Sequence, residues 1–295
     1  MEGRTITKYR SFYEQWYRNR KAEESFSFMK EVIASFLRKR LLRLFARYFL
    51  FFYSIRDVCF RDFFEDNMAP HSTILDLGCG EGRSYFSEYG NVVGLDMAIG
   101  PLRNAIKKYE TAIRGAVEFL PFRDFTFDFV VSSDLLGHVP DKNKNKVLDE
   151  IRRVLKTNGN TAHVVETESK DFCFRLAREQ PELFNRYFIE QIGGHFGLER
   201  PSQVIHRFQT AGFVSVNVEK LWGPFWRSQA YVNHFDNEYK ERSLSLKAWV
   251  FFCRLCIVTR IPWVLLDTFL GFLSILQVKL TQVDSSQLLF LDARR

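Results

Sequence analysis

The chain has 295 residues, enough for one large domain, or a domain with sizeable additions, and enough to bury a hydrophobic core. Its 42 Lys and Arg residues outnumber 35 Asp and Glu residues and give a net charge of +7, which indicates an anionic partner, either nucleic acid or a membrane surface. Five scattered cysteines, an odd number, argue against a disulfide framework and favour a reducing cytoplasm.

The first 65 residues have helical patterns and no apolar leader, so no secretory signal is predicted. Between residues 28 and 53, apolar side chains recur at helical spacing, with arginines and lysines interleaved. Such a basic amphipathic helix suits a membrane interface, and it equally suits a lid packed on the core with solvated arginines. Many of the 31 phenylalanines lie outside the central segment described next, which favours the membrane over nucleic acid.

A glycine-rich turn between two short strands is the central feature. Residues 74–77 have the pattern of a buried strand, and Gly78, Gly80 and Gly82 follow at alternate positions, where a backbone can approach a ligand without intervening Cβ atoms. Residues 83–89 are predicted to form a crossover helix, and residues 91–96 a second parallel strand ending in Asp96. Because ligands of open α/β sheets bind outside the carboxyl ends of strands, we expect a nucleotide-like ligand here, with Asp96 accepting hydrogen bonds from both ribose hydroxyls. A tight turn without a ligand is the alternative.

The glycine spacing argues against a dinucleotide cofactor. The G-x-G-x-x-G fingerprint needs glycine at the sixth position, which counting from Gly78 is Arg83. The pattern is instead G-x-G-x-G, with Asp76 just before it. This arrangement resembles the first motif of class I S-adenosylmethionine-dependent methyltransferases.

A second motif lies downstream of a helix predicted from Gly100 to Glu110. Residues 120–132, LPFRDFTFDFVVS, are similar to the L-P-F-x-D-x-x-F-D-x-V-x-S signature of the ubiquinone/menaquinone-type branch of these enzymes. The apolar run 127–131 is predicted to be the fourth strand, buried in a parallel sheet. Residues 132–135, SSDL, differ from the Asn/Asp-Pro-Pro-aromatic sequence of nucleic-acid amino methylases, so no nucleic-acid substrate is expected.

The resemblance covers about residues 70–221 and the last strand, and it implies a doubly wound α/β sheet of seven strands, the last antiparallel, that binds S-adenosylmethionine. By position, Asp76 and the glycine backbone would hold the methionine part, Asp96 the ribose and Met97 the adenine face. Ala116 replaces the acidic residue that usually binds the adenine amino group, so Glu118 or backbone groups are expected to take over that contact. The full set of expected cofactor-binding residues is Asp76, Gly78, Cys79, Gly80, Gly82, Asp96, Met97, Glu118, Phe119, Leu120 and Ser132.

Three titratable residues, Asp134, His138 and His195, are candidates for a catalytic base. A base is needed only if the acceptor must lose a proton before methylation, and structural hydrogen bonding is the alternative role for both histidines. The lone C-x-x-C motif at Cys253 and Cys256 has no second ligand pair nearby, so we expect packing there and no metal site.

The rest of the core is predicted to contain a helix over 141–156, strand five over 161–167, a helix over 201–210, strand six over 214–221 and the antiparallel last strand over 287–293. Residues 223–286 would be an insertion. Its apolar part, 246–278, is interrupted by charges and Pro262 and has no uncharged run of the roughly 18 to 20 residues that a membrane span requires. We expect a helical hairpin lying on one leaflet with Trp249 and Trp263 as interface anchors. A helical subdomain packed on the core or in a dimer interface is the alternative.

These patterns predict three parts: a helical lid or membrane-interface segment over 1–69, a methyltransferase core over 70–222 plus 287–295, and an apolar helical insertion over 223–286. The leading hypothesis is an S-adenosylmethionine-dependent methyltransferase that acts on a small lipophilic or lipid-linked acceptor, as a peripheral protein at the cytoplasmic membrane face. A methyltransferase of a soluble metabolite or sugar, and a cofactor-binding protein without transferase activity, are the alternatives.

Overall fold

The computed structural model describes residues 13–14, 38–39, 42–43, 51–69, 71–169, 172–190, 194–222, 227–259 and 261–295. The basic amphipathic helix predicted over 28–53 lies almost entirely outside these residues, so its role stays a prediction.

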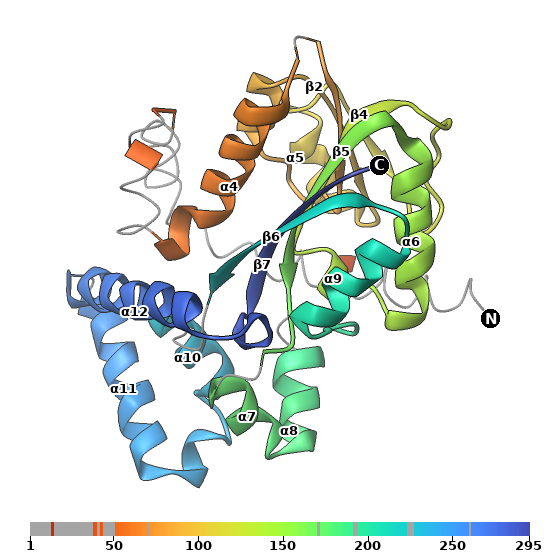
Figure 1. Cartoon of the computed structure of the whole chain (residues 1–295). Helices are drawn as coiled ribbons and strands as arrows, with labels where there is room; N and C mark the ends of the chain where they lie inside the picture. Colours follow the sequence, from red (N-terminus) through yellow and green to blue (C-terminus); the bar gives the residue numbers. More distant parts are fainter. Residues whose placement is uncertain are drawn as a thin grey trace.

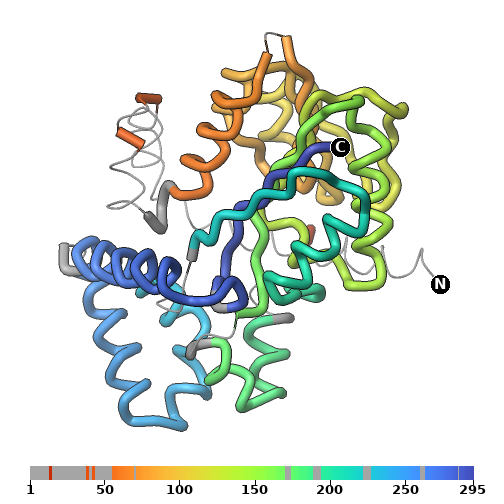
Figure 2. The backbone as a smooth tube through the Cα atoms, viewed as in Figure 1, coloured from red at the N-terminus to blue at the C-terminus, as the bar shows by residue number. Residues whose placement is uncertain are grey.

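A seven-stranded sheet forms the centre of the described chain (Figure 1). The strand order is β3-β2-β1-β4-β5-β7-β6, and β7 runs antiparallel to both of its neighbours. Figure 2 shows the last strand running back between β5 and β6 to the C-terminus. This topology confirms the predicted fold class. The strands are β1 (Thr73–Leu77), β2 (Asn91–Asp96), β3 (Thr111–Arg114), β4 (Phe127–Ser133), β5 (Leu155–Glu166), β6 (Val214–Trp222) and β7 (Leu288–Arg294).

Helices cover both faces of the sheet. On one face α4 (Phe51–Asn67) packs an aromatic surface against the strands, with the Phe60 ring 5.5 Å from that of Phe290 and the Phe63 ring 5.8 Å from that of Phe129. On the other face α6 (Asp141–Val154) and α9 (Pro201–Thr210) bury apolar side chains that recur at helical spacing. The short helix α5 (Ile99–Ala105) follows β2. Burial on both faces explains why β1 and β4 are apolar nearly throughout.

A second group of helices gathers at the end of the sheet where β5 leads into α7 (Figure 1). These helices are α7 (Phe172–Arg178), α8 (Pro181–Phe184), a π-helical turn (Asn185–Glu190), α10 (Ser228–Phe235), α11 (Leu244–Thr259) and α12 (Ile261–Leu280). All of them except α12 contribute to a largely aromatic core, which includes Phe188, Phe235 and Tyr239, whereas Leu270 of α12 packs in the core beneath α4. The last three helices lie between β6 and β7 in the chain.

Four local predictions were wrong in extent, one of them strand five, which was expected over 161–167 and is observed as β5 over Leu155–Glu166. The helix predicted over 83–89 is a 3-10 helix, η2 (Ser84–Glu88). The helix expected to reach Glu110 ends at Ala105, because the chain turns there to place Tyr109 under the glycine turn. The helix expected to reach residue 156 ends at Val154, and β5 begins at once at Leu155.

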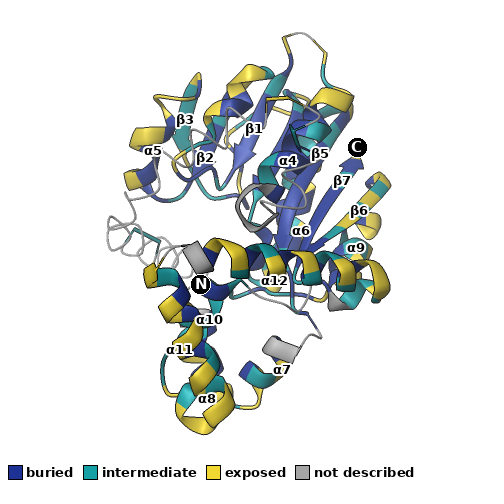
Figure 3. Cartoon of the chain, turned by 90° about the vertical axis from the view of Figure 1, so that its left-hand side faces the viewer, coloured by how far each residue is buried: buried dark blue, intermediate teal, exposed yellow. Residues whose placement is uncertain are grey.

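The α11–α12 hairpin has an apolar surface in contact with solvent (Figure 3). Phe251 and Val258 on α11 are 67% and 74% exposed, and Leu265 on α12 is 68% exposed. We call this surface the apolar face, and its members are Leu244, Phe251, Phe252, Leu255, Val258, Val264, Leu265, Phe269, Phe272, Leu276 and Leu280.

The proposed anchor role of Trp263 is wrong, because its side chain is buried. Trp249 is half-buried, with its ring edge-on to Tyr231 at 5.7 Å, so its anchor role stays a prediction. Among the described helices, α12 is long and apolar enough over Trp263–Leu280 to cross a membrane, by length and composition only, and a third of that stretch is buried in the molecule.

Candidate functional site

The glycine turn after β1 is held against the end of β2. Gly78, Gly80 and Gly82 all adopt positive φ values, +64°, +54° and +73°, a region where residues with a Cβ atom are strained. The N–H groups of Gly78 and Cys79 both donate to the carbonyl oxygen of Leu95, at 2.8 and 3.1 Å. A Cβ atom at Gly82 would lie 3.2 Å from Ala105 Cα, so close packing adds to the requirement for glycine.

Asp96 lies directly beside this turn, as the sequence suggested. Its Oδ2 accepts the N–H of Gly80 at 2.9 Å, and its Oδ1 accepts the N–H of Ala98 at 2.8 Å. Burial raises the pKa of Asp96, and the two backbone donors oppose that rise. Each carboxylate oxygen keeps the capacity to accept a further hydrogen bond.

Asp76 is buried behind the turn and is 4% exposed. Its Oδ2 accepts the hydroxyl of Tyr109 at 2.7 Å, and the Tyr109 oxygen accepts the N–H of Arg83 at 2.6 Å. Burial raises the pKa of Asp76 to about 7, against the lowering effects of the Tyr109 hydroxyl and of Arg83. Sequence reasoning missed Tyr109, and its position after a short helix gave no local signal of this contact.

A polar network links the turn to α4. Arg83 pairs with Asp57 at 2.8 Å and donates to the Ser133 hydroxyl at 2.9 Å. Arg56 binds Asp134 through two nitrogens at 3.0 to 3.1 Å. Asp134, predicted as a possible base, is therefore engaged by a guanidinium group.

The 116–120 loop brings Glu118 into the protein. Glu118 is 6% exposed, its Oε1 accepts the Asn143 amide at 3.0 Å, and its Oε2 is buried with no hydrogen-bond partner among the described residues. An unsatisfied buried carboxylate oxygen is costly, so it indicates a missing donor.

The other expected cofactor-binding residues differ in their surroundings. Met97 is half-buried, and its carbonyl oxygen accepts Arg114 Nε at 3.1 Å. Phe119 is half exposed beneath the Lys146 ammonium, whereas Leu120 is buried and donates its N–H to Glu150 at 2.7 Å. Cys79 is buried, which raises its thiol pKa.

The side chain of Ser132 contacts His163 and not the glycine turn. Its hydroxyl is fully buried and lies 2.7 Å from Nδ1 of His163, a histidine whose ring contacts Phe208 of α9. Its backbone pairs with β1 and β5 on either side, so the predicted cofactor contact of Ser132 stays a prediction.

His138 and His195, which are distant in sequence, meet at a third residue that the sequence did not reveal. Their rings stack with centroids 4.7 Å apart, and the Nε2 atoms of His195 and His138 lie 2.5 and 3.8 Å from Oε2 of Glu166. Burial lowers the pKa of His138, and the neighbouring His195 lowers it further. Burial also lowers the pKa of His195, but the Glu166 carboxylate outweighs it and raises that pKa to about 8. The pKa of Glu166 is lowered by the same pairing, against the effect of burial.

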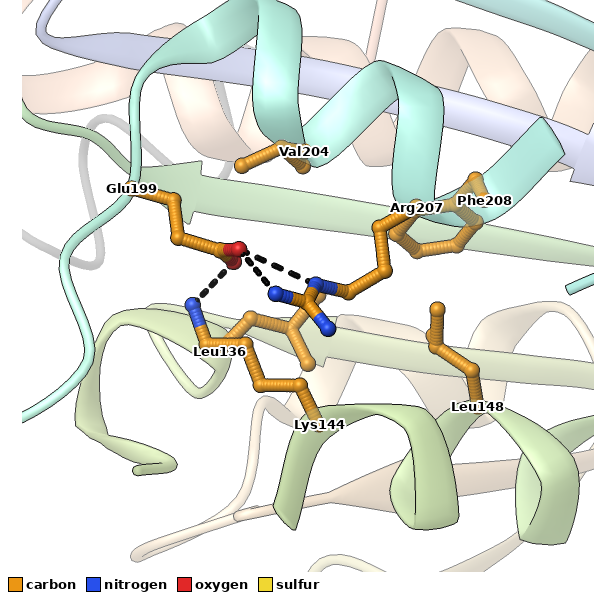
Figure 4. A pocket seen from close by; sticks show the side chains of 7 residues that line it. All are labelled: Leu136, Lys144, Leu148, Glu199, Val204, Arg207 and Phe208. Atoms are coloured by element: carbon orange, nitrogen blue, oxygen red, sulfur yellow. Dashed lines mark hydrogen bonds and ion pairs between the residues drawn. The ribbon is translucent and has the colours of Figure 1, made fainter. Parts of the chain in front are cut away.

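Two cavities lie away from the glycine turn. A cavity of about 10 Å³ is lined by Glu199, Lys144 and Arg207, where the carboxylate of Glu199 binds both cations (Figure 4). An open cavity of about 600 Å³ is lined by α4 together with β6 and β7. The first cavity lies at an ion cluster that joins α6 to α9, so we assign these residues a structural role and no ligand.

Comparison with known proteins agrees with this geometry. The family model described as "Methyltransferase domain" (Methyltransf_11) matches residues 75–162, which span β1 to β5. The demethylmenaquinone methyltransferase of Lactiplantibacillus plantarum is 29% identical over 183 residues, covering 52% of this chain and 76% of that protein. The sterol 24-C-methyltransferase of Schizosaccharomyces pombe is 37% identical over 158 residues, covering 50% of this chain and 40% of that protein.

Solved structures show the same fold. The phosphoethanolamine N-methyltransferase 2 of Haemonchus contortus, in complex with S-adenosyl-L-methionine, superposes with a TM-score of 0.51 at 19% identity, covering 81% of this chain and 52% of that chain. The chain spans about half the length of several curated relatives that it matches.

The sheet order and glycine turn define a class I S-adenosylmethionine-dependent methyltransferase fold, and S-adenosylmethionine is the cofactor of that class. Residues 75–162, which span β1 to β5, match the type 11 methyltransferase domain model, and the demethylmenaquinone methyltransferase relatives are similar over about half of this chain, in agreement with the motifs.

Proposed function

We propose that the chain binds S-adenosylmethionine along the glycine turn and transfers its methyl group to a small lipophilic acceptor at a membrane face. The observation that carries the cofactor part is the 2.9 Å contact between the Gly80 N–H and Asp96 Oδ2. It puts a carboxylate with spare acceptor capacity next to a backbone that a ligand can approach closely. In this proposal the ribose hydroxyls donate to Asp96.

Glu118 supports the same orientation of the ligand. Its buried Oε2 lacks a donor among the described residues, and an adenine amino group is a donor. Asn143 holds the other oxygen at 3.0 Å and so fixes the direction of the carboxylate. Glu118 would thus replace the acidic residue whose usual position is taken by Ala116.

When bound, the cofactor supplies an activated methyl group together with its own leaving group. The residues of this chain then have to align the acceptor with the methyl carbon and exclude water. Methyl transfer would be an in-line displacement at that carbon, with S-adenosylhomocysteine as the leaving group, so the chain itself need not supply a leaving group. His138, whose pKa is lowered by burial, lies at the end of the sheet beyond β4 and can take a proton from the acceptor, whereas pairing with Glu166 keeps His195 protonated near neutral pH.

The apolar face of α11 and α12 supports a lipophilic acceptor. Eleven large apolar side chains are exposed there, and monomeric soluble proteins rarely expose such extensive surfaces. The relatives named for demethylmenaquinone and sterol substrates are compatible with this choice. A membrane-bound acceptor would reach the site beside the same helices.

Transfer of a labelled methyl group tests the activity directly. The full chain would be incubated with methyl-labelled S-adenosylmethionine and either a lipid extract or a water-soluble extract of the source cells. We expect label in the lipid fraction, and its loss with the Asp96→Ala variant. Label in the aqueous fraction alone would contradict the lipophilic acceptor, and label in neither fraction would contradict the transferase.

A further inference from the structure

Three side chains from separate segments converge at the carboxyl end of the sheet. His138 ends the 3-10 helix η3 (Leu136–His138) after β4, Glu166 ends β5, and His195 lies in the loop before α9. All three are half-buried, and one ligand atom from each lies within 4.8 Å of the others. Ligands of open α/β sheets bind at this edge.

Both imidazole rings turn the same nitrogen toward the carboxylate. Nδ1 of His138 lies 3.2 Å from the carbonyl oxygen of Gly194, and Nδ1 of His195 lies 3.3 Å from the carbonyl oxygen of Phe188. A carbonyl can only accept, so each Nδ1 donates its hydrogen, and Nε2 of neutral His138 then carries a lone pair. Nε2 of His195 donates to the Glu166 carboxylate and offers a lone pair once a metal ion displaces that proton. Metal-binding histidines are commonly oriented by this kind of backbone contact.

The spacing of the lone-pair atoms fits one shared cation. Nε2 of His195 and Nε2 of His138 lie 2.5 and 3.8 Å from Oε2 of Glu166. Two ligands bound to one zinc ion at about 2.0 to 2.2 Å each are separated by roughly 3 to 3.5 Å. The 2.5 Å distance is shorter and the 3.8 Å distance longer than that range, so metal binding would require the two histidine side chains to rotate slightly around the carboxylate.

We propose that His138, Glu166 and His195 bind one divalent first-row transition metal ion, with zinc as the reference ion. Two imidazole nitrogens and one carboxylate oxygen suit zinc and its neighbours better than magnesium or calcium, which prefer ligand sets made of oxygen alone. The site was not expected from the sequence, because its members are 28 and 29 residues apart and form no spacing motif.

The role of the ion rests on the proposed function, whereas its binding does not. Three protein ligands leave an open position on the ion. With Nε2 of His138 bound to the ion, that histidine would not act as the base. An acceptor hydroxyl at the open position would instead release its proton to solvent more readily, and its oxygen would then attack the methyl carbon while S-adenosylhomocysteine leaves. The metal site therefore favours a hydroxyl-bearing acceptor.

Cobalt and zinc titrations of the full chain, stripped with a chelator and without S-adenosylmethionine, test the site. We expect one zinc ion per chain and a cobalt spectrum without a thiolate charge-transfer band. His138→Ala, His195→Ala and Glu166→Gln should each weaken zinc binding at least about 100-fold, since loss of even an orienting residue costs 10- to 100-fold. His206→Ala, which removes an exposed histidine on α9, is the matched control and should bind zinc like the unaltered chain.

Each possible result decides the question. No zinc binding by the unaltered chain would overturn the proposal, and this readout does not depend on any variant folding. A thiolate band, or equal binding by the three variants and the control, would place the ion elsewhere and overturn it too. Asp96→Ala should still bind zinc but should no longer bind the cofactor. Absence of the metal site and absence of the proposed function are therefore distinguishable.

Discussion

At the scale of single residues, Asp76 shows how burial can set a protonation state. Its pKa is raised to about 7, mainly by burial, so the folded chain keeps a proton that the unfolded chain loses near pH 4. The stability linked to this proton is complete below about pH 4 and is lost as the pH rises to about 7.

We predict that the Asp76→Asn variant removes this pH dependence. Between pH 4 and pH 7.5, the free energy of unfolding of the unaltered chain should fall by up to about 4 kcal/mol relative to that of the variant. This energy corresponds to the difference of about three units between the pKa of Asp76 in the folded chain and in the unfolded chain. Denaturant titrations at several pH values measure it. The exposed Asp149→Asn on α6 is the control, and parallel profiles for the unaltered chain and Asp76→Asn would contradict the account.

Glu118 gives a second residue-scale prediction. Glu118→Gln keeps the size of the side chain but can no longer offer two acceptor oxygens, so S-adenosylhomocysteine should bind about tenfold more weakly, the effect of one lost hydrogen bond. Equilibrium binding measures this, and the melting temperature should change little. Unchanged affinity would show that the unsatisfied oxygen of Glu118 does not face the ligand.

The sequence predicted some parts of this site and could not predict others. The glycine turn and Asp96 are close in the chain, and the strand pairing that brings them together follows from local patterns. Tyr109, Arg56 and Glu166 reach the site only through tertiary packing, so no sequence motif could predict their roles. The same limit applies to Ser132, whose side chain faces His163 because of its place in the sheet.

At the scale of helices, the Glu199 carboxylate joins α6 to α9 by binding Lys144 and Arg207 (Figure 4). Burial lowers the pKa of Lys144, against the opposing effect of its pairing with Glu199. Removing one partner of a buried ion pair leaves an uncompensated charge.

We predict that Glu199→Ala destabilises the chain by roughly 3 to 5 kcal/mol. Chemical denaturation should detect this as a lower transition midpoint. Asp149→Ala, an exposed change on α6, should have an effect within about 0.5 kcal/mol. A loss below about 1 kcal/mol for Glu199→Ala would mean that water reaches Lys144 in solution.

The α11–α12 hairpin shows why helix faces are harder to predict than helix positions. Apolar composition correctly indicated two helices, but residues on all sides of α12 are apolar, so periodicity could not say which side faces the core. The structure turns Trp263 inward and leaves Leu265 and Phe269 outside. Aromatic type alone was therefore a poor guide to the exposed side.

At the scale of the whole molecule, most of the exposed large apolar side chains among the described residues lie on α11 and α12, whose exposed residues are visible in Figure 3. The net charge of +7 adds attraction to anionic lipids. The proposed membrane contact combines these two features.

Flotation with vesicles that contain anionic lipid tests that contact. The unaltered chain should float, and the double variant Leu265→Asp, Phe269→Asp should remain in the soluble fraction, because charge on the apolar face opposes insertion. Ile106→Asp places a charge on an exposed apolar residue just after α5 and should still float. Equal flotation of all three proteins would contradict the assignment, as would a stable dimer of the unaltered chain that the double variant dissociates.

Binding of S-adenosylhomocysteine, measured by calorimetry, tests the central claim most directly. The account predicts one molecule bound per chain, with an affinity lowered at least about 100-fold in Asp96→Ala, because two hydrogen bonds to a carboxylate are lost. Asp149→Ala should bind like the unaltered chain. No binding by the unaltered chain, or equal affinity in Asp96→Ala, would contradict a cofactor site at the glycine turn.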